Sequence, residues 1–166
     1  MQIYDVDTSI PLSRIIGALF DREVRVIAGD WRGVQYWVDN SKRESDPTVW
    51  IFDPSCMTSE DLMPLADFMD ASMSGDVLDA IDYDEFTEWL DVNGRSRIGE
   101  AECVPVVPPQ FVSGREDADN RAAASFSTVA YILSSAKTFA AMAKLGLKPG
   151  DEFPPNFRDL VSPSTD

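Results

Sequence analysis

The chain has 166 residues, enough for one domain with a single core, and its 44% of hydrophobic residues is ordinary for a folded soluble protein. Asp and Glu number 29 against 14 Lys and Arg, so the formal net charge is −15, and histidine is absent. The charge disfavours nucleic acid and anionic membranes as partners and favours cationic ones, and the missing histidine excludes every histidine-dependent nucleophile system and histidine-ligated metal site.

The N-terminal third predicts a helix followed by three strands. Residues 9–21 form the helix, because apolar side chains recur there at helical spacing. Those side chains are Leu12, Ile15, Ile16, Leu19 and Phe20. The strands cover residues 23–28, 33–39 and 48–52. The first two alternate in polarity, whereas the third is apolar throughout and is therefore expected to be covered on both faces. Short connections favour an antiparallel meander.

Helical patterns return in the middle and at the end of the chain. Thr58 and Asp61 resemble a capping box for a middle helix, whose apolar face would contact the sheet. That face consists of Leu62, Leu65, Phe68 and Met69. Residues 95–121 are rich in proline and predict at most a short strand near residues 102–107. A final helix begins at Ser127 and ends at Gly146. Its predicted core stripe is Val129, Ile132, Leu133, Ala136, Phe139, Ala140 and Ala143.

These elements predict a single α+β domain over residues 1–150, in which a small antiparallel sheet is packed against several helices. Residues 151–166 would form a proline-rich tail, partly docked through Phe153 and Phe157. The N-terminus lacks the pattern of a secretory signal, and no stretch approaches the roughly 20 apolar residues of a membrane span. With only two cysteines, Cys56 and Cys103, we expect a cytoplasmic protein with reduced thiols.

Acidic residues are concentrated in the middle of the chain. Residues 44–94 contain 14 acids and neither Lys nor Arg. A solvated helix face usually mixes charges of both signs, because oppositely charged neighbours at i and i+4 stabilise it. A run of one sign lacks that support and adds repulsion. Solubility is one explanation for the run, and a site for metal or for a partner is another.

Metal sites fit the acidic run poorly. If residues 74–85 are aligned with an EF-hand loop, only the second half of the loop matches. In the first half, Ser74, Leu78 and Asp79 stand where ligands and a glycine are required. A carboxylate cluster that holds magnesium for catalysis is also disfavoured. No lysine lies in a Glu-x-Lys setting, and no glycine-rich phosphate loop is present. We therefore expect no metal, no cofactor and no catalytic residue, and we interpret the chain as a non-enzyme.

A protein-binding surface fits the acidic run better. In a helix over residues 83–91, aromatic and apolar side chains would face one side and carboxylates the other, with a break near Asp82. An array of fixed carboxylates suits a cationic groove on another protein and speeds association with it. The predicted partner-binding residues are Asp79, Asp82, Asp84, Glu85, Glu88 and Asp91, with Glu116 and Asp117 as a second patch.

One segment resembles a known family. The sequence ECVPVVPPQFVSGREDADN, residues 102–120, is similar to a signature in bacterial immunity proteins of the type VI secretion DNase-immunity family. The matching positions are Glu102, Cys103, Pro108, Gly114, Glu116, Asp117 and Asn120. GDWRGVQYWVD, VWIFDP and LADFMDASMSGD are similar to that family's preceding strands and helix. Pro105 and Ser113 depart from the pattern.

The resemblance implies an antitoxin-like role, in which the chain binds a co-encoded toxin and blocks its active site or substrate groove. A nuclease toxin must be basic where it grips nucleic acid, which agrees with the acidic run. The alternative interpretation is a phage or mobile-element protein that imitates DNA and inhibits a host nucleic-acid-binding protein. Both interpretations leave the oligomeric state open.

Overall fold

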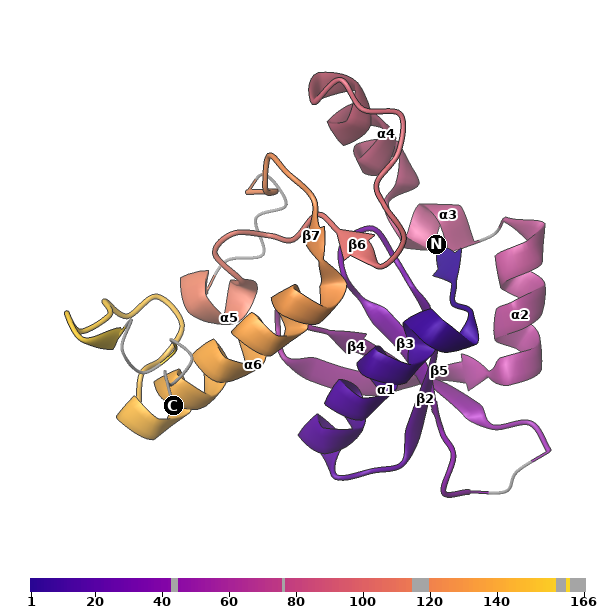
Figure 1. Ribbon diagram of the computed structural model, residues 1–166, viewed down its shortest axis with the longest axis horizontal. Coiled ribbons are helices and arrows are strands. Elements are labelled where there is room, and N and C mark those ends of the chain that lie inside the picture. Colours follow the sequence, from indigo (N-terminus) through magenta and orange to yellow (C-terminus); the bar gives the residue numbers. More distant parts are fainter. Residues whose placement is uncertain (43–44, 76, 115–119, 158–160, 162–166) are drawn as a thin grey trace.

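The fold is α+β, as predicted, with a small antiparallel sheet packed against several helices (Figure 1). The computed structural model describes residues 1–42, 45–75, 77–114, 120–157 and 161. The strands of the main sheet, in chain order and in spatial order, are β1 (Gln2–Ile3), β2 (Val24–Gly29), β3 (Gln35–Asp39), β4 (Thr48–Asp53) and β5 (Thr58–Pro64). A second sheet pairs β6 (Glu102–Cys103) with β7 (Phe126–Ser127). The helices are α1 (Val6–Phe20), α2 (Leu65–Ser74), α3 (Val77–Ala80), α4 (Tyr83–Val92), α5 (Gln110–Ser113) and α6 (Thr128–Leu145).

Helices cover both faces of the main sheet. On one face, α1 and α6 lie side by side, and Ile16 and Ile132 pack against Trp37 (Figure 1). On the other face, α2 places Phe68 against Tyr36, with ring centroids 5.2 Å apart. Strand β4, between β3 and the edge strand β5, contributes buried residues to both clusters. Its continuous apolar sequence predicted this arrangement correctly, and the predicted meander is also confirmed.

Helix α1 begins earlier than the sequence predicted. Asp5 caps it, because its carboxylate accepts a hydrogen bond from the Thr8 amide over 2.9 Å. The hydroxyl groups of Ser9 and Ser13 bond the carbonyl and amide of Val26 in β2. Strand β1 pairs with β2 only at Gly29 and Ala28, so these serines satisfy backbone groups that β1 leaves open.

The predicted helix start at Thr58 is wrong. Thr58 begins strand β5, and it lies opposite Asp53 at the far end of β4. Sheet pairing along β4 overrides the local capping pattern, and α2 begins only after Pro64. Leu65, Phe68 and Met69 belong to the core as predicted. Leu62 lies on the edge strand instead and is exposed.

The ends of α6 are confirmed, but its buried side is not the predicted stripe. Ser127 caps the first turn, and Gly146 ends the helix at φ 69°. Leu133 and Phe139 are more than 40% exposed. The buried residues are Thr128, Tyr131, Ile132, Ser135, Ala141 and Met142. The first half of α6 packs on the sheet and the second half on α5, so no single apolar stripe is buried.

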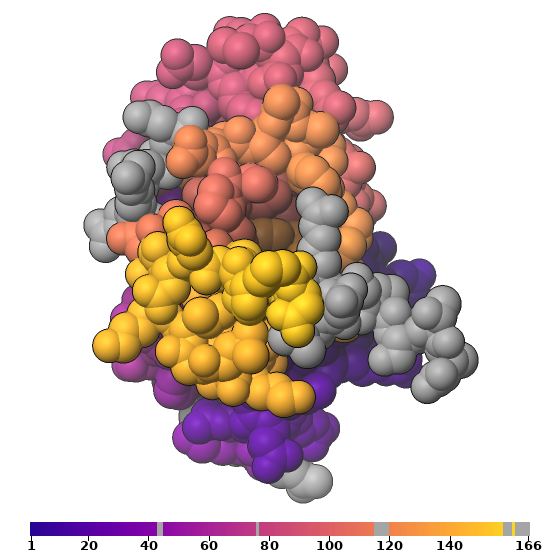
Figure 2. Space-filling model, turned by 90° about the vertical axis from the view of Figure 1, so that its left-hand side faces the viewer, coloured from indigo at the N-terminus to yellow at the C-terminus, as the bar shows by residue number. Residues whose placement is uncertain are grey.

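The segment after α6 docks on the domain through Phe157, which packs with Phe111 and Met142. Docking through Phe157 is confirmed, whereas Phe153 is exposed and stacks on Phe157, with ring centroids 4.0 Å apart. In Figure 2 this segment, in yellow, covers the centre of one face of the molecule. The division of the chain at residue 150 stays a prediction. Within the described residues, no helix combines the length and the apolar character needed to cross a membrane.

Candidate functional site

The acidic segment forms two helices, α3 and α4, with the predicted break at Asp82. Asp82 adopts the left-handed conformation at φ 50°, which turns the chain between the helices. Residues 77–80, which would lie in the loop of an EF-hand, form helix α3 instead. In Figure 1, α4 projects beyond the layer formed by the sheet and the larger helices.

Trp31, in the turn between β2 and β3, anchors α4. This residue is 4% exposed and packs in a cluster with Trp89 and Val104. Its ring stacks on Phe86 of α4 at a centroid distance of 5.2 Å. Its indole N–H donates to the carbonyl of Ile81, just before α4. The aromatic side of α4 thus faces the domain, as predicted: Trp89 is buried and Phe86 is partly buried, while Tyr83 is exposed.

Four of the predicted partner-binding residues are exposed, and no ion pair involves them within the described part of the chain. They are Asp79, Asp84, Glu88 and Asp91. We call these four residues the acidic surface. Figure 2 shows that the segment carrying them, in pink, forms the upper rim of the molecule. No described arginine or lysine lies within ion-pair distance of their carboxylates.

Asp82 and Glu85, unlike the residues of the acidic surface, are bonded to arginines of the domain. Asp82 accepts a hydrogen bond from the Arg32 guanidinium over 2.6 Å. Glu85 accepts one from Arg121 Nε over 2.9 Å, and the same guanidinium lies 4.6 Å from the ring centroid of Trp31. These two acids therefore fix α4 to the domain. Glu116 and Asp117, the predicted second patch, lie outside the described residues.

Arg32 is itself held by a buried carboxylate. Asp30 accepts two hydrogen bonds from the Arg32 guanidinium, at 2.9 and 2.7 Å, and two more from the amides of Arg32 and Val34. Burial raises the pKa of the Asp30 carboxyl, and these hydrogen bonds oppose the rise. Burial lowers the pKa of Arg32, but the Asp30 carboxylate outweighs it, so the pKa of the guanidinium is raised. Arg32 thus stays charged and links the β2–β3 turn to the α3–α4 junction.

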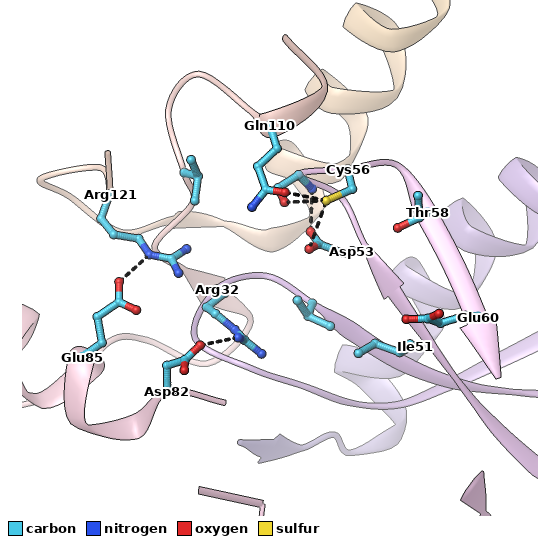
Figure 3. Close-up of a pocket in the computed structure, with 13 residues that line it drawn as sticks. Arg32, Ile51, Asp53, Cys56, Thr58, Glu60, Asp82, Glu85, Gln110 and Arg121 are labelled. Carbon is cyan, nitrogen blue, oxygen red and sulfur yellow. Dashed lines mark hydrogen bonds and ion pairs between the residues drawn. The ribbon is translucent and has the colours of Figure 1, made fainter. Parts of the chain in front are cut away.

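A pocket of about 510 Å³ opens beside this junction. Arg32 and Arg121, with their acidic partners, form one side, whereas Asp53, Cys56 and Gln110 form the other (Figure 3). The remaining lining residues are Val34, Ile51, Ser55, Thr58, Glu60 and Val106. We call this cavity the junction pocket. It extends from the α3–α4 junction, at Asp82, to the end of β4, at Asp53.

The inner side of the junction pocket is ordered by hydrogen bonds. Asp53 accepts one from the Ser55 amide over 2.7 Å. The Cys56 thiol lies 2.8 Å from the amide oxygen of Gln110 and 3.6 Å from Asp53. The sequence did not single out these residues as site residues. No local sequence pattern could indicate them, because Gln110 is 54 positions from Cys56 and contacts it only in the folded structure.

The described residues that carry the family resemblance have structural roles. Glu102 accepts hydrogen bonds from the Gly99 amide and the Ser125 hydroxyl, both at 2.8 Å. Cys103 is fully buried, and burial raises its pKa to about 12. Gly114 ends α5 at φ 68°, where a Cβ atom would lie 3.2 Å from Pro149. These contacts hold Glu102, Cys103 and Gly114 in place.

No protein-family model, curated protein or solved structure matches the chain. Among the described residues, no group of three or more Asp, Glu or Cys side chains is arranged to hold a metal ion. The site is therefore characterised by its own geometry. Helix α4 is anchored through Trp31 and Arg121, its exposed carboxylates have no ion-pair partner in the part of the chain that the structure describes, and a polar pocket lies at its base.

Proposed function

We propose that this protein is an immunity protein that binds and neutralises a basic toxin through the acidic surface. The observation that carries the proposal is that the acidic surface keeps four exposed carboxylates without a cationic partner in the described chain. Such carboxylates repel one another, which lowers the stability of the free protein. A cationic partner removes that repulsion on binding.

The way α4 is held supports the same role. Stacking on Trp31 and the ion pair between Glu85 and Arg121 fix the helix before any partner arrives. A preformed surface loses less conformational entropy on binding than a mobile one. Fixed charges also attract an oppositely charged partner over several ångströms and speed the encounter. Both properties suit a protein that must capture a toxin before the toxin acts.

A nuclease is the class of toxin that fits the acidic surface best. A nuclease must carry cationic side chains where it grips phosphates, and a carboxylate array competes for the same side chains. The resemblance to type VI secretion DNase-immunity proteins points to this class too. We propose that the chain acts in the cytoplasm, where it meets the toxin before the toxin reaches nucleic acid.

Co-expression tests the proposal. The gene would be expressed together with the product of the gene next to it, and cell growth would be followed. We expect growth to be restored by the wild-type chain and the two proteins to co-purify. If the neighbouring product is toxic and the chain neither restores growth nor co-purifies with it, the proposal is wrong. Capture of a host DNA-binding protein instead would favour a DNA-mimic inhibitor.

A further inference from the structure

Two carboxylates of the junction pocket, Asp53 and Glu60, have no cationic partner among the described residues. In that part of the chain, the donors to Asp53 are neutral: the Ser55 amide and the Cys56 thiol. Glu60 stands on the rim at strand β5, with no ion pair in the described chain. The volume of about 510 Å³ lies within the range of roughly 300–1,000 Å³ that is common for ligand sites. The pocket is thus large enough to receive a whole side chain.

The arginines of the pocket do not make it a site for anions. Arg32 is bonded to Asp30 and Asp82, and Arg121 is bonded to Glu85. An incoming anion would compete with these carboxylates at close range. Among the described residues, four acids line the pocket, and Asp30, which is bonded to Arg32, is a fifth. These five acids face two arginines, Arg32 and Arg121. The excess charge is negative and lies on the side of Asp53 and Glu60.

The hydrogen-bonding groups around Asp53 favour a guanidinium group as the ligand. A guanidinium is planar and carries five N–H donors, so it can bond a carboxylate and neighbouring acceptors together. The Asp53 carboxylate and the Thr58 hydroxyl group supply oxygen acceptors on one side of the cavity (Figure 3), and Ser55 also lines it. The apolar side chains of Val34 and Ile51 line the same cavity and suit the methylene stem of such a residue.

We propose that the junction pocket receives one arginine side chain of the bound partner, with its guanidinium on Asp53 and Glu60. The inference rests on the proposed function for the identity of the partner. The acidic surface then attracts the basic protein, and the pocket fixes its register by burying one anchor residue. Buried arginine anchors are frequent among the residues that dominate binding energy.

The test uses argininamide as a probe of the pocket in the free protein, followed by amide NMR shifts. Citrullinamide, which has nearly the same shape but no charge, is the matched ligand. We expect argininamide to shift the amides of Ser55, Cys56 and Thr58 with a dissociation constant of about 1–10 mM, since a single side chain makes few contacts. Citrullinamide should leave these amides in place.

Two double variants separate the pocket from the general negative charge. Asp53→Asn with Glu60→Gln should abolish the shifts at Ser55, Cys56 and Thr58. Asp70→Asn with Glu23→Gln removes the same charge from exposed positions elsewhere and should preserve them. Absence of localised shifts, or equal shifts in both variants, would overturn the inference. Micromolar binding of argininamide would also overturn the inference, because a site that binds the free molecule so tightly would be a site for a small cationic ligand and not for a side chain of a protein.

Failure of this inference is distinguishable from failure of the proposed function. If the chain is an immunity protein without an arginine anchor, the pocket variant restores growth beside the toxin as well as the wild type does, and argininamide does not bind. If the chain is not an immunity protein, no variant restores growth, whereas the argininamide titration still reports on the pocket.

Discussion

Glu85 of α4 accepts a hydrogen bond from Arg121 across 36 positions of sequence, over a distance of 2.9 Å. The same arginine lies over the ring of Trp31, so one side chain connects the acidic helix, the β2–β3 turn and the segment before β7. An acid that the helical pattern assigned to the partner therefore stabilises the fold. This contact leads to the first prediction.

The pair is expected to be energetically coupled. In a double-mutant cycle with Glu85→Gln and Arg121→Gln, we expect a coupling energy of about 1 kcal/mol, because both side chains are partly shielded from water. Arg121→Gln should destabilise more than Glu85→Gln, since only the arginine also contacts Trp31. Urea unfolding of the four proteins measures both quantities. Additive effects of the two substitutions would contradict the coupling.

Trp31 is expected to be the main anchor of α4. Trp31→Ala should lower the free energy of unfolding by about 3–5 kcal/mol, as for other large aromatic side chains removed from a core. Trp31→Phe should lose less, because it keeps a ring for Phe86 and Arg121 to contact. Denaturation followed by circular dichroism compares the two variants. Equal losses would show that the ring contacts contribute little.

The carboxylate of Glu102 is expected to contribute to the loss of folding stability at acidic pH. Hydrogen bonds from the Gly99 amide and Ser125, opposed by slight burial, lower the pKa of Glu102 from its usual value of 4.5. A lowered pKa in the folded state stabilises the protein above about pH 4.5, and that stabilisation is lost as the pH falls through the folded-state pKa.

Substitution of Glu102 tests this contribution. In Glu102→Gln, stability should fall less steeply with acid below the usual carboxyl pKa than in the wild type, as measured by thermal unfolding over a series of pH values. Glu152→Gln removes an equal charge from an exposed position and serves as the control. A wild-type slope in Glu102→Gln would mean that the hydrogen bonds do not favour the charged form.

The two cysteines are expected to differ in reactivity. They form no disulfide, and Cys103 is fully buried with a pKa raised by burial to about 12. Cys56 is half-buried on the wall of the junction pocket. A short pulse of iodoacetamide on the native protein should alkylate Cys56 before Cys103, and urea should remove the difference. Peptide mass spectrometry reports each site, and faster alkylation of native Cys103 would contradict its burial.

Local sequence patterns predicted the acidic helices correctly, but they did not predict the ion pairs that hold these helices to the rest of the domain. The break at Asp82 and the inward placement of Phe86 and Trp89 follow from spacing within a dozen residues. The partners of Asp82 and Glu85 are 50 and 36 positions away, so no local pattern contains them. For the same reason the sequence assigned all the acids of α4 to a partner.

The errors at β5 and α6 have a similar origin. The residues from Thr58 to Pro64 have a polar, cap-like sequence, and only pairing with β4 makes them a strand. In α6, Thr128 and Ser135 are buried although they are polar, because the helix contacts different elements along its length. Tertiary contacts thus decided both cases against local preference.

The most direct test of the central claim is the association rate between this protein and the toxin obtained by co-expression, measured at several salt concentrations. The site variant carries Asp84→Asn, Glu88→Gln and Asp91→Asn, and the control carries Asp67→Asn, Asp70→Asn and Glu23→Gln, with an equal change in charge. We predict that the site variant associates about tenfold more slowly at low salt and responds less to salt, while the control behaves like the wild type. Equal rates and equal salt dependence in the site variant and the control would contradict binding through the acidic surface.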